Sequence, residues 1–349
     1  MIWQQACRTA FLKNSTFIIS VTPQVIDADG FDDAAAEVEI RPLFIGEEHH
    51  GCRLDRALAT MAPEFSRSYL QQLVALGAVT LNEQTVLKPA HKVKAGDRGA
   101  IALRPTPQSQ AFKAEPSTLD VVYQDDDLLV INKPAGLVVH PAPGNWNGTL
   151  MNQLLGLDVK AFDLPRAGIV HRLDKDTSGL MVVARTRRVM DALVQAIAER
   201  SVKRQYLALA HAQWRGAAQR QVDAPIGRDP KNRLRMAVVD LALHPGKPAR
   251  TDFELLANAP AGCLVKCTLH TGRTHQIRVH MASIGHPLVA DALYGGARTA
   301  GMQHQALHAA RLALMHPVTR QQLVFECAPP ADFSAALDTW GLGYNWASF

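Results

Sequence analysis

The sequence predicts an α+β protein of two unequal domains, the larger of which is built on a largely antiparallel sheet. Strand-like apolar runs outnumber helical stretches after residue 119, and the two do not alternate regularly as they would around a doubly wound parallel sheet. A polar, proline-containing segment at residues 105–118 is interpreted as a linker that separates this region from a smaller unit at residues 46–104. With 349 residues, 47% of them apolar, the chain can bury a substantial core.

The small unit begins with two helical patterns and ends with strands. Leu54, Leu58 and Met61 follow the spacing of one helix face. A second helix is predicted to start at the N-cap Ser66 and to end at Gly77. Short alternating runs after Gly77 predict strands that close the unit.

The large domain is expected at residues 119–335 and combines strands with two helices. The helices are predicted at Arg188–Arg200 and Thr274–Ile284. The apolar runs that predict strands are DLLVI, GLMVVA, YLALA and CLVKCTL. The remaining segments are expected to be a mobile, acidic N-terminal extension at residues 1–45 and a C-terminal tail at residues 336–349.

Positive charge is concentrated in the body of the chain. The net charge is +5, but residues 1–50 have 3 Lys or Arg against 8 Asp or Glu, which leaves 34 against 24 in the rest. A basic body suits a polyanion such as nucleic acid, although a well-solvated surface gives the same count. No apolar run approaches the ~20 residues that a membrane span needs, and no signal-peptide core is present, so we expect a cytoplasmic protein.

The five cysteines do not form paired CxxC units, and an odd, scattered set fits a reducing compartment. Cys263 and Cys267 lie in the apolar run CLVKC and are interpreted as small buried residues rather than metal ligands. The histidines of HTGRTHQIRVH lack the HExxH spacing of a zinc hydrolase. We therefore predict no metal site.

The most informative stretch is GIVHRLDKDTSGLMVVART, which runs from Gly168 to Thr186. Its polar residues stand between an apolar entry and an apolar strand, so they are expected at a strand end or in a loop. Taken singly, His171 could be a core histidine, and Asp174 or Asp176 could cap a turn. As a ten-residue run of mixed chemistry, however, HRLDKDTSGL is similar to the signature of the RluA/RluD family of pseudouridine synthases.

Three further segments support this resemblance and imply which residues act. In the family pattern catalysis falls on Asp174, whereas Asp176 holds the loop. KRQYLALAHA resembles the segment that supplies an active-site tyrosine, here Tyr206, and TGRTHQIRVHMASIGHPLVADALYG resembles the segment that supplies a basic partner, here Arg278. NKPAGLVVHPAPGN is the fourth match, and the segments stand in the family order across most of residues 119–330.

The resemblance also implies an RNA substrate. GCRLDRALA and SRSYLQQLVALGAVTLN are similar to an S4-type RNA-binding domain over most of residues 51–104, and segments such as PRAGIVHRLDKDTSGLMVVA and DAPIGRDPKNR are similar to the RluD branch of the family. This branch implies 23S ribosomal RNA, at the stem-loop called helix 69, as free RNA or as a precursor of the large subunit. The alternatives are other 23S uridines and a non-catalytic ribosome-assembly factor, and the presence of all three catalytic residues argues against the latter. We expect a monomer.

The isomerisation of uridine explains why these residue types are needed. No electrons or groups are gained or lost, so no cofactor is expected. An ionised carboxylate, Asp174, would attack the nucleoside or remove a sugar proton. A cation within ~4–6 Å favours that ionised form, and Arg278 could hold the carboxylate bidentately, although it could instead bind phosphate. Tyr206 would stack on the uracil, or it is an ordinary core aromatic residue.

Binding to RNA is expected to involve further polar residues. The resemblance implies that Arg172 takes the place of a uridine flipped out of its stack, although it could instead hold a phosphate. The other candidate RNA-binding or substrate-binding residues are His171, Lys175, Thr177, Arg273, His275, Gln276, Arg53 and Arg67. Candidate phosphate contacts are Lys175, Arg185, Arg187, Arg188, Lys203, Arg204, Arg228, Lys231, Arg233 and Arg235.

Overall fold

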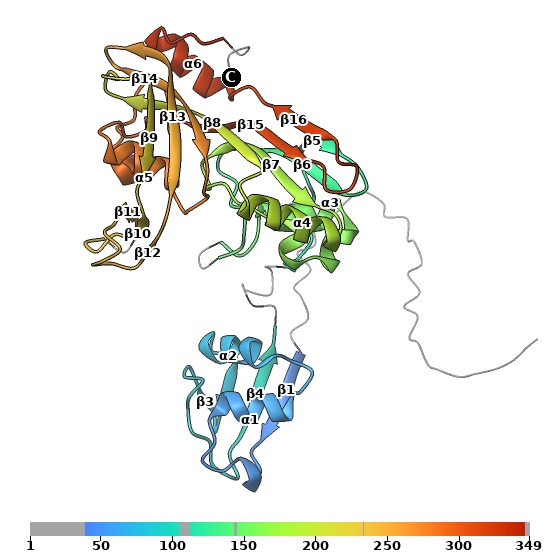
Figure 1. Cartoon of the computed structure of the whole chain (residues 1–349). Coiled ribbons are helices and arrows are strands. Elements are labelled where there is room, and N and C mark those ends of the chain that lie inside the picture. The colour runs from blue at the N-terminus through green and yellow to red at the C-terminus, as the bar shows by residue number, and fades with distance from the viewer. Residues whose placement is uncertain (1–38, 105, 107–111, 143–144, 233, 346–349) are drawn as a thin grey trace, which may run out of the picture.

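The computed structural model describes residues 39–345, except 105, 107–111, 143–144 and 233. The chain forms a small domain and a large domain, each with its own hydrophobic core (Figure 1). Both contain helices and sheets, which confirms the predicted α+β class. The predictions made for residues 1–38 lie outside the described residues.

The small domain packs two helices against a four-stranded antiparallel sheet of order β1-β4-β2-β3. The predicted cap of the second helix is present, because the Ser66 hydroxyl accepts a hydrogen bond from the Tyr69 backbone N–H at 3.2 Å. The elements are β1 (Glu39–Phe44), η1 (Glu47–His49), α1 (Leu54–Met61), α2 (Arg67–Ala75), β2 (Val79–Leu81), β3 (Gln84–Thr85) and β4 (Arg98–Leu103).

Strand β1 corrects the expected N-terminal boundary. It lies inside the segment predicted as a mobile extension, and it pairs with β4 from Glu39 opposite Leu103 to Phe44 opposite Arg98. The small domain therefore begins at or before residue 39 rather than at residue 46. The strand gave little sequence signal because it is a sheet edge with one buried face, and acidic residues precede it.

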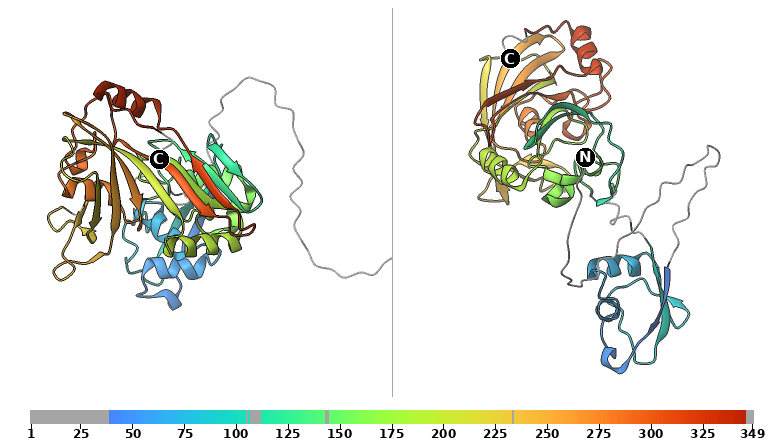
Figure 2. Two further views of the ribbon diagram at one scale, coloured as in Figure 1. Left: turned by 45° about the horizontal axis from the view of Figure 1, so that its top comes forward. Right: turned by 90° about the vertical axis from the view of Figure 1, so that its right-hand side faces the viewer.

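The large domain is built on a nine-stranded sheet of order β5-β6-β7-β15-β8-β14-β13-β9, with β16 paired to β15 (Figure 2). Only β7 and β15 pair in parallel among the described strands, so the sheet is mixed and largely antiparallel, as predicted. The strands are β5 (Asp120–Gln124), β6 (Leu128–Lys133), β7 (Ser178–Ala184), β8 (Lys203–His211), β9 (Gln219–Asp223), β13 (Arg250–Ala259), β14 (Gly262–Leu269), β15 (Leu307–Met315) and β16 (Gln322–Glu326).

Helices cover the large sheet, and a small second sheet lies at its β9 end. The helical elements are α3 (Leu150–Leu157), η3 (Val159–Asp163), η4 (Pro165–Gly168), α4 (Arg187–Ala198), α5 (Gln276–Ser283), η5 (Ala292–Tyr294) and α6 (Ala331–Trp340). The second sheet, of order β11-β10-β12, is formed by β10 (Ile226–Arg228), β11 (Met236–Val238) and β12 (Gly246–Lys247).

Strand β7 is buried on both faces, which explains its continuous apolar run. Met181 packs in the cluster that includes Leu150 of α3, whereas Val182 packs in the cluster that includes Val189 of α4. Alternate side chains of a strand point to opposite faces, so β7 must be apolar throughout. The rigid strand that follows Asp174 is therefore anchored in two cores.

Helix α6 corrects the expected C-terminal boundary. It crosses the predicted limit at residue 335, and it buries Phe333, Ala336 and Leu337 against residues of β8 and β15. Leu342, beyond the helix, is also buried. The large domain therefore extends to at least residue 342, because the i, i+3, i+4 spacing of these residues forms an apolar helix face.

Two expectations from composition can be compared with the described residues. Cys263 and Cys267 are buried in the core and free, as expected, and burial raises the pKa of the Cys263 thiol to about 12. Within the same residues, every helix is too short or too polar to span a bilayer.

Candidate active site

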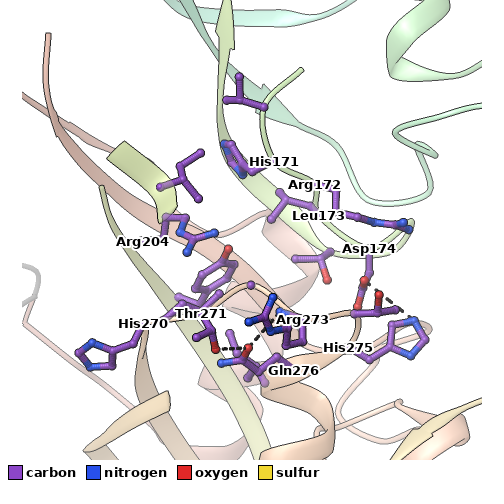
Figure 3. Close-up of a pocket in the computed structure, with 18 of the residues that line it drawn as sticks. His171, Arg172, Leu173, Asp174, Arg204, His270, Thr271, Arg273, His275 and Gln276 are labelled. Atoms are coloured by element: carbon purple, nitrogen blue, oxygen red, sulfur yellow. Dashed lines mark hydrogen bonds and ion pairs between the residues drawn. The ribbon is translucent and has the colours of Figure 1, made fainter. Parts of the chain in front are cut away.

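A pocket of about 630 Å³ in the large domain gathers side chains from segments far apart in the sequence (Figure 3). It lies where the loop before β7, strand β8 and the loop between β14 and α5 meet. The candidate residues that line it are Asp174, Tyr206, Arg278, Arg172, His171, Thr177, Arg273, His275 and Gln276. Lys175, Arg53 and Arg67 are not among the lining residues.

Asp174 and Arg278 form the expected ion pair. The Arg278 Nη1 donates to Asp174 Oδ2 at 3.1 Å, and the Arg278 side chain is only 8% exposed. The bidentate contact, however, is made to a different carboxylate. Arg278 Nε and Nη2 donate to the two oxygens of Asp291 at 2.7 and 2.8 Å. Arg278 therefore joins two carboxylates, and it holds Asp174 through one hydrogen bond.

The local electrostatics keep Arg278 charged. Burial opposes the charge, but the hydrogen bonds and charge of Asp291, and then those of Asp174, outweigh it and hold the pKa of Arg278 above its ordinary value. The guanidinium carbon also lies 5.0 Å from the ring centre of Tyr294. Asp291 was not among the predicted site residues, although it lies within the segment HPLVADALYG that supports the family resemblance.

His275 stands on the other side of Asp174. Its Nε2 is 4.0 Å from Asp174 Oδ1, and its Nδ1 is 2.8 Å from the Tyr294 hydroxyl. The residue is the N-cap of α5 and has a left-handed backbone with φ 57°. Burial lowers the pKa of His275, with Asp174 acting in the opposite direction. A neutral imidazole therefore flanks the carboxylate.

Lys133 braces the Asp174 loop and was missed by the sequence prediction. It is fully buried at the end of β6, and its ammonium group donates to three backbone oxygens, including that of Lys175 at 2.9 Å. Burial lowers the pKa of Lys133 to about 8, although Asp176 and Asp174 act in the opposite direction. Its place in the matched segment NKPAGLVVHP was the available signal.

Tyr206 belongs both to the core and to the pocket. It lies on β8 opposite Cys267 of β14, it is 4% exposed, and it is one of the residues that line the pocket. Burial raises the pKa of the Tyr206 phenol, so the hydroxyl is neutral at neutral pH. The core interpretation is therefore confirmed, whereas the functional role of Tyr206 stays a prediction that its place in the pocket wall allows.

Gln276 serves the loop between β14 and α5. Its side-chain oxygen accepts from the Thr271 hydroxyl and the Arg273 backbone N–H at 2.7 and 3.0 Å, and its amide donates to Thr251 Oγ1 at 2.9 Å. The residue is 3% exposed. Its polar atoms therefore hold the loop in shape, and its predicted contact with RNA stays a prediction.

The remaining candidates of the Asp174 loop differ in exposure. Arg172 is exposed and lines the pocket, which suits contact with a large ligand. Lys175 is exposed outside the pocket. Thr177 is buried, and its hydroxyl accepts from the Gln305 amide at 3.3 Å. Of the three, Arg172 is best placed to meet substrate.

Several arginines proposed as phosphate contacts are already engaged. Arg185 pairs with Asp158 at 2.7 Å, and Arg187 pairs with Asp191 at 3.0 Å. Arg204 is 7% exposed and therefore cannot lie on the outer surface. The prediction for Arg233 falls outside the described residues.

In the small domain, Arg53 and Arg67 share one buried carboxylate. Asp55 has no exposed side-chain surface, and its oxygens accept from Arg53 at 3.0 and 3.1 Å, from Arg67 at 2.9 and 3.2 Å, and from Gln71. The two arginine side chains remain about half exposed. The arrangement fixes two guanidinium groups at the surface, where they can meet phosphate.

Asp125, Asp127 and His316 could in principle hold a cation, but both carboxylate oxygens of Asp125 are used within the fold. Asp125 Oδ2 accepts from the Tyr123 hydroxyl and lies 2.9 Å from His316 Nε2. Its Oδ1 accepts from two backbone N–H groups of the β5–β6 turn. The cluster therefore serves as a turn cap.

Known proteins share both domains. The family model described as RNA pseudouridylate synthase matches residues 127–283, and the S4 domain model matches residues 52–98. Ribosomal large subunit pseudouridine synthase D of Neisseria meningitidis is 44% identical over 325 residues, covering 88% of this chain and 84% of that protein. The protein of the same name from Nitrosomonas europaea is 45% identical, with 82% and 84% covered. The solved structure of human RNA pseudouridylate synthase domain containing 1 is 26% identical, with a TM-score of 0.50, and covers 65% of this chain and 86% of that one.

The similarities confirm both resemblances inferred from the sequence. The matched region of the synthase model includes Asp174, Tyr206 and Arg278, and that of the S4 model includes Arg53 and Arg67. The chain therefore belongs to the RNA pseudouridylate synthase family, and it is an RNA pseudouridine synthase, an isomerase with an S4 domain.

Proposed function

We propose that this enzyme converts specific uridines of 23S ribosomal RNA to pseudouridine, at helix 69 of the large subunit, with Asp174 as the catalytic carboxylate. The observation that best supports the role of Asp174 is its placement in the pocket beside Arg278, opposite Tyr206 and flanked by His275. The ribosomal substrate is supported by the names of the relatives from Neisseria and Nitrosomonas.

The ion pair prepares Asp174 for either route open to a carboxylate. Attack on the nucleoside and removal of a sugar proton both require the ionised form. Arg278 orients the carboxylate through its hydrogen bond, because Asp291 fixes the guanidinium from behind. Arg278 bonds only to Oδ2 of Asp174. The other carboxylate oxygen, Oδ1, lies 4.0 Å from His275 Nε2 and makes no short ionic contact with it.

Arg172 and Tyr206 suit the handling of an extruded base. A stacked uridine must leave its helix to reach a pocket of this kind, at a cost of a few kcal/mol. Arg172, exposed at the pocket, would fill the vacated place in the RNA. Tyr206 presents an aromatic ring against which the uracil would stack.

The S4 domain would grip the RNA outside the reacting nucleotide. Arg53 and Arg67 are held by Asp55 with half of their side-chain surface exposed. Phosphate contacts of this type set affinity and its salt dependence, whereas the large domain selects the nucleotide.

Pseudouridine mapping of large-subunit ribosomal RNA tests the proposal. Cells that lack the protein are complemented with wild type, Asp174→Asn or Asp176→Asn, the last as a matched carboxylate of the same loop. We expect pseudouridines of helix 69 to vanish in the deletion, to return with wild type and Asp176→Asn, and to stay absent with Asp174→Asn.

Other maps would change the proposal in defined ways. Loss of pseudouridines elsewhere in 23S RNA would replace helix 69 as the target. Restoration of every site by Asp174→Asn would reject Asp174 as the catalytic residue. An unchanged map together with defective subunit assembly would favour a non-catalytic assembly factor.

A further inference from the structure

Arg204 is a buried cation in the wall of the pocket. It lies on β8, two residues before Tyr206, and is 7% exposed. Its Nε is buried without a hydrogen-bond partner, and the part of the chain that the structure describes offers the guanidinium no ion pair. The group lies over Gly272, where a side-chain carbon would stand 3.0 Å from Arg204 Nη1.

His171 contributes a second buried donor without a partner to the same pocket. Its Nε2 accepts a hydrogen bond from the Val182 backbone N–H at 3.1 Å. A nitrogen that accepts from an N–H has no proton, so the neutral imidazole has its proton on Nδ1. That Nδ1 is buried and has no hydrogen-bond partner among the residues that the structure describes. Strand β7 thus fixes the tautomer that aims an N–H donor away from Val182.

The positive charge of Arg204 acts on the imidazole of His171. Burial, and secondly the charge of Arg204, lower the pKa of His171 to about 3, so the imidazole stays neutral. Buried donors without partners are costly, and a positive group beside an N–H donor adds repulsion. An acceptor atom of a ligand in the pocket would remove this cost.

We propose that Arg204 and the Nδ1–H of His171 together bind the O4 carbonyl of the flipped uracil. In uracil, C4 is opposite N1, so O4 is the exocyclic atom farthest from the sugar on which Asp174 acts. Figure 3 shows His171 and Arg204 on one side of the pocket and Asp174 on the other. A backbone phosphate would instead stay at the mouth of the pocket, where Arg172 is exposed.

This contact would also select the base. Cytosine has an amino group where uracil has O4, so two protein donors would face a third donor. A buried site built for an acceptor rejects such an analogue strongly, because its polar groups stay unpaired. The inference rests on the family's pseudouridine synthase reaction and on base binding in this pocket.

Single-turnover conversion by variants of the two donors tests the inference. The RNA is one that wild type converts, which keeps failure of the ribosomal assignment separate. Arg204→Met removes the donors while keeping most of the stem, and Arg204→Lys keeps the charge. Arg220→Met removes an exposed arginine of β9 as the matched control. We expect Arg204→Met to lower the rate roughly tenfold to a hundredfold, Arg204→Lys to lower it less, and the control to leave it unchanged.

His171 is tested with two amide side chains that mimic different ring nitrogens. His171→Asn keeps a donor near the Nδ1 position, whereas His171→Gln keeps an acceptor near Nε2. The inference requires the Asn variant to retain more activity than the Gln variant. The reverse order would show that the bond from Val182 to Nε2 is the only important role of the ring.

Substrate atoms supply the decisive comparison. Sulfur accepts hydrogen bonds weakly, so 4-thiouridine at the target should slow wild type, and Arg204→Met should then cause little further loss. With 2-thiouridine, which keeps O4, Arg204→Met should lower the rate by as large a factor as it does with uridine.

Two results would overturn the inference. One is an Arg204→Met effect that is as large on 4-thiouridine as on uridine. The other is a phosphate signature, in which the variant weakens RNA binding and flattens the slope of log Kd against log salt by ~0.7 without a change of rate at saturation. Thermal unfolding of each variant shows whether it is folded.

Discussion

Two buried ionic clusters in this enzyme have opposite compositions. In the large domain one arginine, Arg278, lies between two carboxylates, Asp174 and Asp291. In the small domain one carboxylate, Asp55, lies between two arginines. In each cluster the central residue, which carries the opposite charge to its two partners, is buried. The exposed side-chain fraction is 8% for Arg278 and 0% for Asp55.

Because the compositions are opposite, one cluster leaves a negative charge accessible to a ligand and the other leaves positive charge accessible. The large-domain cluster has one carboxylate in excess, and Asp174, at 16% exposure, is the member that faces the pocket. The small-domain cluster has one arginine in excess, and both guanidinium groups are about half exposed. In the function proposed above, each centre would fix the group that meets RNA, a carboxylate for chemistry in one domain and cations for phosphate in the other.

Among the changes that test this comparison, removal of the Asp291 charge should have the largest effect on the reaction rate. Asp291→Asn leaves Arg278 buried with one weakened partner, and loss of one member of a buried pair typically costs about 3–5 kcal/mol. Arg278 would then turn toward Asp174 and change its orientation. We expect the rate at saturating RNA to fall roughly tenfold to a hundredfold with little change in Kd, measured by single-turnover kinetics and urea unfolding.

An exposed pair provides the control for Asp291. Asp191→Asn breaks an i, i+4 pair with Arg187 on the surface, so its effect on stability should stay below about 0.5 kcal/mol, with normal activity. Asp291→Glu, which keeps the charge, should recover part of the rate. If Asp291→Asn instead lowered stability but left the rate unchanged, Asp291 would be structural only.

This cluster also shows what the sequence could and could not predict. Asp174 and Arg278 could be paired because both fall in segments similar to one family. The bidentate partner could not be identified, since the contact from α5 to Asp291 depends on the path of the intervening loop. Arg204 was predicted as a phosphate contact because charge alone does not reveal burial, and β1 was missed because a half-buried edge strand has little pattern.

A change of pH should separate the two domains. Burial lowers the pKa of His171 to about 3 and that of His308 to about 4. Below the unfolded value near 6.5, the unfolded chain binds protons that these folded imidazoles do not. The contribution of these histidines to the free energy of unfolding of the large domain is therefore fully present above pH 6.5. It falls as the pH drops toward 4, by up to about 1.4 kcal/mol per pH unit for each histidine.

The small domain should be insensitive in that window. Hydrogen bonds from Arg53, against the cost of burial, hold the pKa of Asp55 well below its usual value, so its contribution is lost only under more acidic conditions. The described tryptophans, Trp146, Trp214 and Trp340, all lie in the large domain, so fluorescence-monitored urea unfolding at pH 7 and pH 5 follows it selectively once Trp3 and Trp346 are replaced by Phe. His308→Gln should reduce the pH dependence, and a flat profile would contradict it.

Neutralising the centre of the small-domain cluster should have the smallest effect on the reaction. Asp55→Asn keeps the shape but weakens the bonds that fix Arg53 and Arg67. We expect RNA affinity to fall roughly tenfold, because two phosphate contacts lose their fixed positions. The rate at saturating RNA should remain that of wild type, since the pocket is in the other domain.

Salt dependence distinguishes this effect from unfolding of the small domain. Arg67→Gln alone should reduce the slope of log Kd against log salt by ~0.7–0.9, the value for one phosphate contact. Arg56→Gln, which removes an exposed arginine of α1, is the matched comparison for general charge loss. If Arg56→Gln and Arg67→Gln had the same slope, the cluster would contribute only overall charge. A larger reduction of the slope for Arg67→Gln than for Arg56→Gln would show that Asp55 positions a cation for RNA.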